Sequence, residues 1–248
     1  MQSNLLQVQG KIAESVENAT RALQLADPTN LKVVGLAWLG LGSAYRQAGD
    51  FDKAAEALQN AIQTSRASQN LVTEMLAVSH LTLMSIQHGR LRLAAEAASQ
   101  VIDREGTLPP IAGAVQGALG LVALEWNQME KAREHLLRGI KVSAFLGHNA
   151  SLIYTKVTLA RLYQSQGDLE SAAKTVGEAI ELFQRGAPGW MRPELIYRQV
   201  CLTLAQEDPA QAETILWQSG VSSQDEVSHQ TDYIHLAYLR LWMVQHKD

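Results

Sequence analysis

Cysteine is nearly absent from this sequence, with Cys201 alone among 248 residues. One thiol can form neither a disulfide framework nor a cysteine-based zinc site. The seven histidines offer no pair three or four residues apart, the spacing that a metal site on a helix uses. We therefore expect no metal and no cofactor. Cys201 lies in an apolar phrase, which predicts a buried and unreactive thiol.

Charge of either sign is also sparse, with 21 Lys and Arg against 25 Asp and Glu, a formal net charge of −4. Direct nucleic-acid binding needs clustered Lys and Arg, so we expect none. No apolar run approaches the roughly 20 residues that cross a bilayer. The first nine residues lack the charged and apolar blocks of a signal peptide. These absences predict a cytoplasmic protein without a membrane partner.

Prolines and strand signals are few. Six prolines separate long stretches rich in Ala, Leu, Gln and Glu, which are strong helix formers. There is no sustained alternation of β-branched and aromatic residues, and no Asn-Gly hairpin. Apolar residues make up 46% of the chain, which is enough for a sizeable core. The composition predicts an all-α protein.

A motif recurs about every forty residues. The segments 45–54 and 163–172 both read Tyr, three residues, Gly-Asp, an apolar residue, an acid and then Ala. Weaker copies lie around Gly89 and Asn127, where Asn replaces the Gly. The alanines of the four copies are spaced by 40, 38 and 40 residues; they are Ala54, Ala94, Ala132 and Ala172. Such periodicity is typical of a repeat architecture.

Each copy is expected to be a helical hairpin. The Gly or Asn ends one helix in the left-handed conformation, and Asp50 or Asp168 caps the next. A single hairpin cannot bury its apolar faces, so the hairpins must stack. We predict one domain over residues 1–248, a right-handed superhelical solenoid of five to six hairpins. The expected links are 65–70, 104–110, 143–151 and 185–192.

Both ends of the chain fall inside repeats. The segment 12–25 is a second helix without most of its first, and 232–246 is a first helix without a second. That last segment is apolar nearly all round, so it is expected to need a partner. We therefore expect either that the sequence is a segment of a longer protein or that its ends pair in a homo-oligomer. Trp190 and Trp242 are candidate interface residues, since exposed tryptophans often anchor contacts.

The first full hairpin matches the tetratricopeptide (TPR) pattern at Trp38, Leu41, Gly42, Tyr45, Gly49, Ala54 and Ala61. Leu58 stands where that pattern has Phe, and the usual period is 34 rather than 40 residues. With its longer period, the stretch 36–183 resembles the helical-repeat region of MalT-like, LuxR-type ATP-dependent transcription activators. The phrases 39–50, 120–132 and 232–245 carry this resemblance. In that family an ATPase module precedes the repeats and a helix-turn-helix domain follows them.

The resemblance implies a sensor and oligomerisation region that binds a small-molecule inducer or a regulatory protein. The alternative is a free-standing TPR adaptor that binds a peptide of a partner protein in its concave groove. Neither is an enzyme: the sequence has no Gly-x-Ser-x-Gly elbow and no phosphate-binding Gly-x-x-x-x-Gly-Lys-Ser/Thr loop.

The first helices of stacked hairpins line the concave face, so their inward positions are the candidate ligand or peptide groove. Among them Arg46 and Arg161 stand out, since burying an unpaired guanidinium is costly. The alternative for any one position is packing against a neighbouring helix. The predicted groove residues are Ser43, Arg46, Gln47, Gln87, Glu125, Tyr154, Arg161 and Gln164.

Overall fold

The structure is a computed structural model that describes residues 12–102, 112–145, 149–228 and 230–246. The described residues form twelve α-helices and one short 3-10 helix, with no β-strand among them. The all-α prediction is therefore confirmed. In chain order the elements are α2 (Ile12–Leu25), α3 (Leu31–Ala48), α4 (Phe51–Ala67), α5 (Leu71–Gln87), α6 (Leu91–Ile102), α7 (Ala112–Glu125), α8 (Met129–Phe145), α9 (Asn149–Ser165), α10 (Leu169–Gln184), η1 (Gly189–Met191), α11 (Arg192–Ala205), α12 (Pro209–Trp217) and α13 (Asp232–Gln245).

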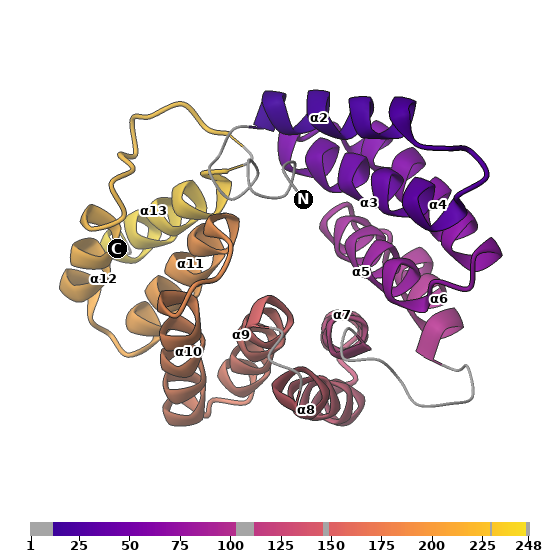
Figure 1. Cartoon of the computed structure of the whole chain (residues 1–248). Helices are drawn as coiled ribbons and strands as arrows, with labels where there is room; N and C mark the ends of the chain where they lie inside the picture. The colour runs from indigo at the N-terminus through magenta and orange to yellow at the C-terminus, as the bar shows by residue number, and fades with distance from the viewer. Residues whose placement is uncertain (1–11, 103–111, 146–148, 229, 247–248) are drawn as a thin grey trace.

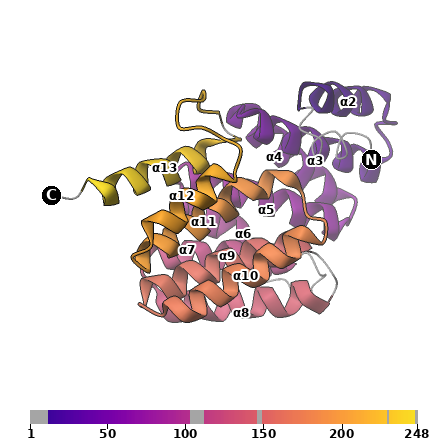
Figure 2. The same ribbon diagram turned by 90° about the vertical axis from the view of Figure 1, so that its left-hand side faces the viewer.

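The helices pack as successive antiparallel hairpins along a curve. Each first helix contacts its own second helix and also the first helix of the next hairpin, in the order α3, α5, α7, α9, α11 and α13. Figure 1 shows these first helices on the inner side of the curve, with α4, α6, α8, α10 and α12 outside. Helix α2 packs on α3 at the start of the described residues, where the sequence predicts a second helix, and α13 lies where it predicts a first helix. The segment before α2 lies outside the described residues. Figure 2 shows the end of α13 projecting beyond the other helices.

Five residues with positive φ mark the turns inside the hairpins. Gly49, Gly89 and Gly167 have φ of 79°, 70° and 79°, whereas Asn127 and Glu207 have 58° and 61°. Their spacing repeats the forty-residue period of the sequence. At Gly49 the left-handed residue closes the helix, because the amide of the following residue donates to the Tyr45 carbonyl. The expected helix stops, including the Asn, are confirmed.

Aspartate side chains begin the second helices as predicted. Asp50 accepts a hydrogen bond from the Lys53 amide at 3.3 Å, and Asp168 accepts one from the Ser171 amide at 3.0 Å. Hydrogen bonds from those residues hold the pKa of both carboxyls below their usual value. Asp208 caps α12 in the same way through the Gln211 amide. Capping therefore recurs in the fifth hairpin, which is the shortest.

The repeated alanines are the points of closest packing between paired helices. All five are fully buried; they are Ala54, Ala94, Ala132, Ala172 and Ala212. Opposite them, a Cβ on Gly42 would lie 2.7 Å from the Leu58 Cγ, and one on Gly120 would lie 2.6 Å from the Leu136 Cγ. Small residues on both helices thus let the two backbones approach. The TPR-type packing is local, and it repeats in every hairpin.

Several links between hairpins are shorter than predicted. Helix α4 continues to Ala67, and α8 and α9 leave only 146–148 between them, so the expected links 65–70 and 143–151 are partly helical. Ser65 and Ser143 are buried helix residues instead of link residues. The link prediction is wrong at these two positions, because tertiary packing continues the helix through serines whose own helix propensity is weak. The predicted link 104–110 lies outside the described residues, and 185–192 contains η1.

Membrane-spanning helices and metal-ligand clusters are both absent from the described residues. No helix in the described ranges combines the length and the apolarity needed to cross a membrane. Those ranges also contain no group of three His, Cys, Asp or Glu side chains that could hold a metal ion. Cys201 is a buried free thiol, as its apolar context predicts.

Candidate functional site

Three of the predicted groove residues lie together where α7, α9 and α11 meet. The Nη2 of Arg161 donates to Glu125 Oε1 across 2.7 Å, which joins α9 to the end of α7. One turn further along α9, Gln164 Nε2 donates to the backbone carbonyl of Cys201 in α11 at 3.2 Å. All of these groups therefore lie on the first helices of three consecutive hairpins.

A cavity of about 340 Å³ opens beside these contacts. Its lining comes from α7, the start of α8, α9, α11 and α13, and combines apolar side chains with cationic ones. The lining residues are Leu124, Met129, Arg161, Gln164, Ser165, Arg198, Cys201 and Arg240. Polar and charged side chains outnumber apolar ones in this lining. A concave site on which several polar groups converge is a candidate small-molecule site.

Tyr197 holds two of the lining arginines. Arg240 Nε donates to the Tyr197 hydroxyl at 2.7 Å, which ties α13 to α11. The guanidinium carbons of Arg198 and Arg240 lie 4.9 and 5.6 Å from the centroid of the Tyr197 ring. Such cation–π contacts orient a guanidinium and leave its charge in place. The Nε of Arg198 is buried and, within the described residues, has no hydrogen-bond partner.

A set of buried titratable groups lies next to the arginines. Burial raises the pKa of Glu194, against the opposing effect of Arg198 and Arg161. Burial also raises the pKa of the Tyr154 hydroxyl well above its usual value, and Glu194 adds to this shift. Glu194 is in turn the largest cause of the raised pKa of Tyr233. The inner face around α9, α11 and α13 is therefore a compact electrostatic network that contains both signs of charge.

The other predicted groove residues lie on the N-terminal hairpins. Ser43, Arg46 and Gln47 are buried in α3. The Arg46 guanidinium carbon lies 5.0 Å from the centroid of the Trp190 ring, and its Nε is buried without a partner in the described part of the chain. Burial lowers the pKa of Arg46 to about 10, so it remains a cation at neutral pH.

Gln87 is exposed at the end of α5, and it lies near enough to Tyr233 of α13 to act on the pKa of the Tyr233 hydroxyl. Together with the Arg46–Trp190 pair, this places early hairpins near late ones. The curve of Figure 1 thus brings together residues more than a hundred positions apart in the sequence. The predicted groove is divided between two regions: one around Arg46 and Trp190, the other around Arg161.

Comparison with known families decides what kind of chain this is. The model of the MalT-like TPR region matches residues 2–248. The chain belongs to this family. A TPR region of this kind is a protein-binding scaffold and typically a non-catalytic module. The resemblance found in the sequence is therefore confirmed, over residues 2–248.

Solved structures share the fold of this MalT-like TPR region at low sequence identity. BtubC (BKLC) from P. vanneervenii has a TM-score of 0.59 at 18% identity, covering 90% of this chain and 94% of its own. The APC/C hetero-tetramer Cut9–Hcn1 has a TM-score of 0.63 at 19% identity, covering 92% and 40%. PilF from Pseudomonas aeruginosa has a TM-score of 0.54 at 16% identity, covering 94% and 93%. No curated protein of similar sequence matches the chain.

The sequence did not point to Arg198 or Arg240 of this TPR region, because the fifth and sixth first helices are incomplete copies of the repeat. A signal was present: Arg240 is the one cation in the apolar segment 232–245, and Arg198 follows Glu194 by one helical turn. A lone cation in an apolar helix generally marks a contact or a site.

The two candidate interface tryptophans differ in their surroundings. Trp190 is 38% exposed, and its ring already takes the Arg46 guanidinium. Trp242 is 57% exposed near the end of α13, beside other large apolar side chains: Leu236, Leu239 and Met243, each 47–55% exposed. The projecting helix of this TPR region therefore carries an apolar surface. A third tryptophan, Trp126 beside the turn after α7, is 41% exposed.

Proposed function

We propose that this chain is the sensor and oligomerisation region of a MalT-like ATP-dependent transcriptional regulator, with no catalytic role of its own. The observation that carries the proposal is the family match over residues 2–248, together with a polar inner face. In this role residues 1–248 act as a single domain. The inner face binds an inducer, and the bound state is passed to ATPase and DNA-binding modules outside this sequence.

The proposed binding face is the set of inward positions on the first helices. The Arg161 region supports this assignment because it combines a cavity with ion-pairing and hydrogen-bonding groups. The Arg46 region supports it because a buried cation without a full set of partners is costly unless it has a use. Around these two regions the proposed contacts are Ser43, Arg46, Gln47, Gln87, Glu125, Tyr154, Arg161 and Gln164.

The alternative is an adaptor that binds a peptide of a partner protein in the same groove. The Cut9–Hcn1 hetero-tetramer, whose fold this chain shares, is a multi-subunit assembly. The reading frame of the gene distinguishes the regulator from the adaptor. An ATPase module encoded in frame before Met1 and a helix-turn-helix domain after Asp248 support the regulator. An open reading frame that starts at Met1 and stops after Asp248 contradicts it and leaves the adaptor.

The apolar face of α13 is the proposed oligomerisation surface, and a second copy of the chain is its proposed partner. We expect sedimentation velocity to show a concentration-dependent dimer. The double variant Leu239→Ser with Trp242→Ala should shift the protein to monomer, because it removes most of the exposed apolar area. Trp217→Ala is the matched control, since Trp217 is 79% exposed on α12. A wild-type chain that stays monomeric at high concentration contradicts this surface.

A further inference from the structure

The cavity between α7, α9, α11 and α13 has an unusual charge distribution. Three arginines line it, and none of the described residues in its wall is acidic. Glu125 pairs with Arg161 at the edge, at 2.7 Å, with 36% of the Glu125 side chain exposed. Glu194 acts on Arg198 and Arg161 from beyond the wall. Three cations thus face one space, against two carboxylates that lie outside it.

The arginines are held in position by groups that leave their charge available. Arg240 is fixed through its Nε by the Tyr197 hydroxyl, and Arg198 lies against the same tyrosine ring. The Nε of Arg198 is buried, with no hydrogen-bond acceptor provided by the described part of the protein. A buried guanidinium with an unused donor is costly, and nearby like charges increase the cost. An anion in the cavity would remove both penalties.

We propose that this cavity binds a small molecule through an oxyanion group, either a carboxylate or a phosphate. A guanidinium donates two parallel hydrogen bonds to either group, and several guanidiniums together select for charge. The volume of about 340 Å³ is at the small end of ligand pockets, so it fits a compact metabolite and not an extended peptide. The apolar wall from Leu124 and Met129 contacts the ligand's carbon skeleton.

The inference rests on the proposed function in one respect, that the inner face is where a ligand binds. It adds the chemistry of that ligand. Binding of anions by the isolated chain tests the chemistry alone, whereas the reading frame of the gene tests the regulator. Either can fail while the other holds.

The experiment is isothermal titration of the full chain with citrate, pyrophosphate and glucose 6-phosphate, with glucose as the uncharged probe. We expect saturable 1:1 binding of at least one charged probe and none of glucose. Citrate against the phosphorylated probes distinguishes carboxylate from phosphate. Arg240→Gln should weaken the binding roughly tenfold or more, because a hydrogen bond to a charged group is lost.

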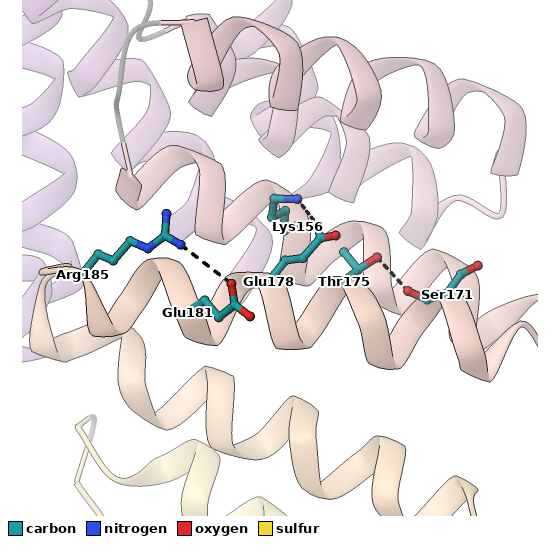
Figure 3. Close-up of polar contacts among 6 residues, drawn as sticks. All are labelled: Lys156, Ser171, Thr175, Glu178, Glu181 and Arg185. Carbon is teal, nitrogen blue, oxygen red and sulfur yellow. Dashed lines mark hydrogen bonds and ion pairs between the residues drawn. The ribbon is translucent and has the colours of Figure 1, made fainter.

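Arg185→Gln is the matched control. Figure 3 shows Arg185, the residue that follows α10, beside Glu181 of that helix, while the Lys156–Glu178 pair joins α9 to α10 nearby. The Arg185 side chain is 70% exposed and does not line the cavity. This variant carries the same charge change and should bind the probes within twofold of wild type. Equal losses in Arg185→Gln and Arg240→Gln would mean unspecific attraction and overturn the proposal.

Glu125→Gln should change the affinity for the charged probes in the opposite direction from Arg240→Gln. It removes the carboxylate that occupies Arg161, so the charged probes should bind roughly twofold to fivefold more tightly. A merely structural Arg161–Glu125 pair would give no such gain. Circular dichroism melts on every variant separate lost binding from lost folding. Absence of saturable binding by any charged probe at millimolar concentration, or binding of an acidic peptide alone, overturns the proposal.

Discussion

At the scale of single residues, Gly40 and Gly42 of α3 distinguish two effects of a glycine: the close helix packing that it permits and its low helix propensity. A Cβ at Gly42 would lie 2.7 Å from the Cγ of the fully buried Leu58, whereas a Cβ at Gly40 meets nothing within 4 Å. Close packing between helices therefore explains the glycine at position 42 and not the one at position 40. The motif position alone therefore does not reveal which glycine is required.

Alanine substitutions at Gly40 and Gly42 should change the stability of the fold in opposite directions. Gly42→Ala should destabilise the fold by about 1–3 kcal/mol, because Leu58 has no free space into which to move. Gly40→Ala should stabilise it by about 0.5–1 kcal/mol, since alanine restricts the unfolded chain and favours helix. Urea unfolding followed by circular dichroism measures both. Equal effects at the two positions would show that the close approach of α3 and α4 is not what Gly42 provides.

At the scale of the hairpin, the sequence predicted most of what the structure has. The period, the left-handed stops, the aspartate caps and the buried alanines are all local rules, so they can be read from residue spacing. Ser65 and Ser143 could not be assigned correctly, because tertiary packing decides whether a serine continues a helix. The site was predicted in part. Glu125, Arg161 and Gln164 came from complete repeats, whereas Arg198 and Arg240 lie in degenerate ones.

The turn of the fifth hairpin has no glycine or asparagine at its left-handed position. Glu207 occupies the left-handed position with φ of 61°, where Gly49 and Gly167 stand in other repeats. A side chain in that conformation costs about 1 kcal/mol or more. Glu207→Gly should therefore raise the free energy of unfolding by about 1 kcal/mol.

Asn127→Gly is the matched control for that turn. Asn127 has φ of 58°, but asparagine tolerates the left-handed conformation, so its replacement should gain less. Thermal unfolding of both variants makes the comparison. A loss of stability in Glu207→Gly would mean that the Glu207 side chain makes a stabilising contact that outweighs its backbone strain.

At the scale of the whole molecule, the curve places Arg46 of an early hairpin against Trp190, in a link between late hairpins. Arg46 lies on the Trp190 ring at 5.0 Å, although α3 and η1 are far apart in the sequence. Local periodicity predicts stacked hairpins but not how far the stack curves, because small rotations between hairpins accumulate. Contacts across the curve were therefore beyond the reach of the sequence.

The variant Arg46→Met tests how the buried charge of Arg46, and its contact with the Trp190 ring, affect the stability of the fold. The residue is 6% exposed, and its Nε has no hydrogen-bond partner among the described residues. Methionine keeps the length and removes the buried charge, so we expect the free energy of unfolding to rise by about 1 kcal/mol. The lost contact with the Trp190 ring offsets part of the gain. Trp190→Leu, which leaves the cation buried without its ring, should instead destabilise the protein.

The pH dependence of this gain identifies its cause. Burial lowers the pKa of Arg46 to about 10, below its value in the unfolded chain. The folded state therefore binds fewer protons than the unfolded state only above that pH, where the stability of the wild type rises relative to the variant. The gain from Arg46→Met should be constant between pH 6 and 9 and shrink above about pH 10. A gain that is absent at neutral pH would show that the Trp190 ring and its surroundings fully compensate the buried charge. The Arg46–Trp190 pair would then be a structural contact that stabilises the packing of early hairpins against late ones.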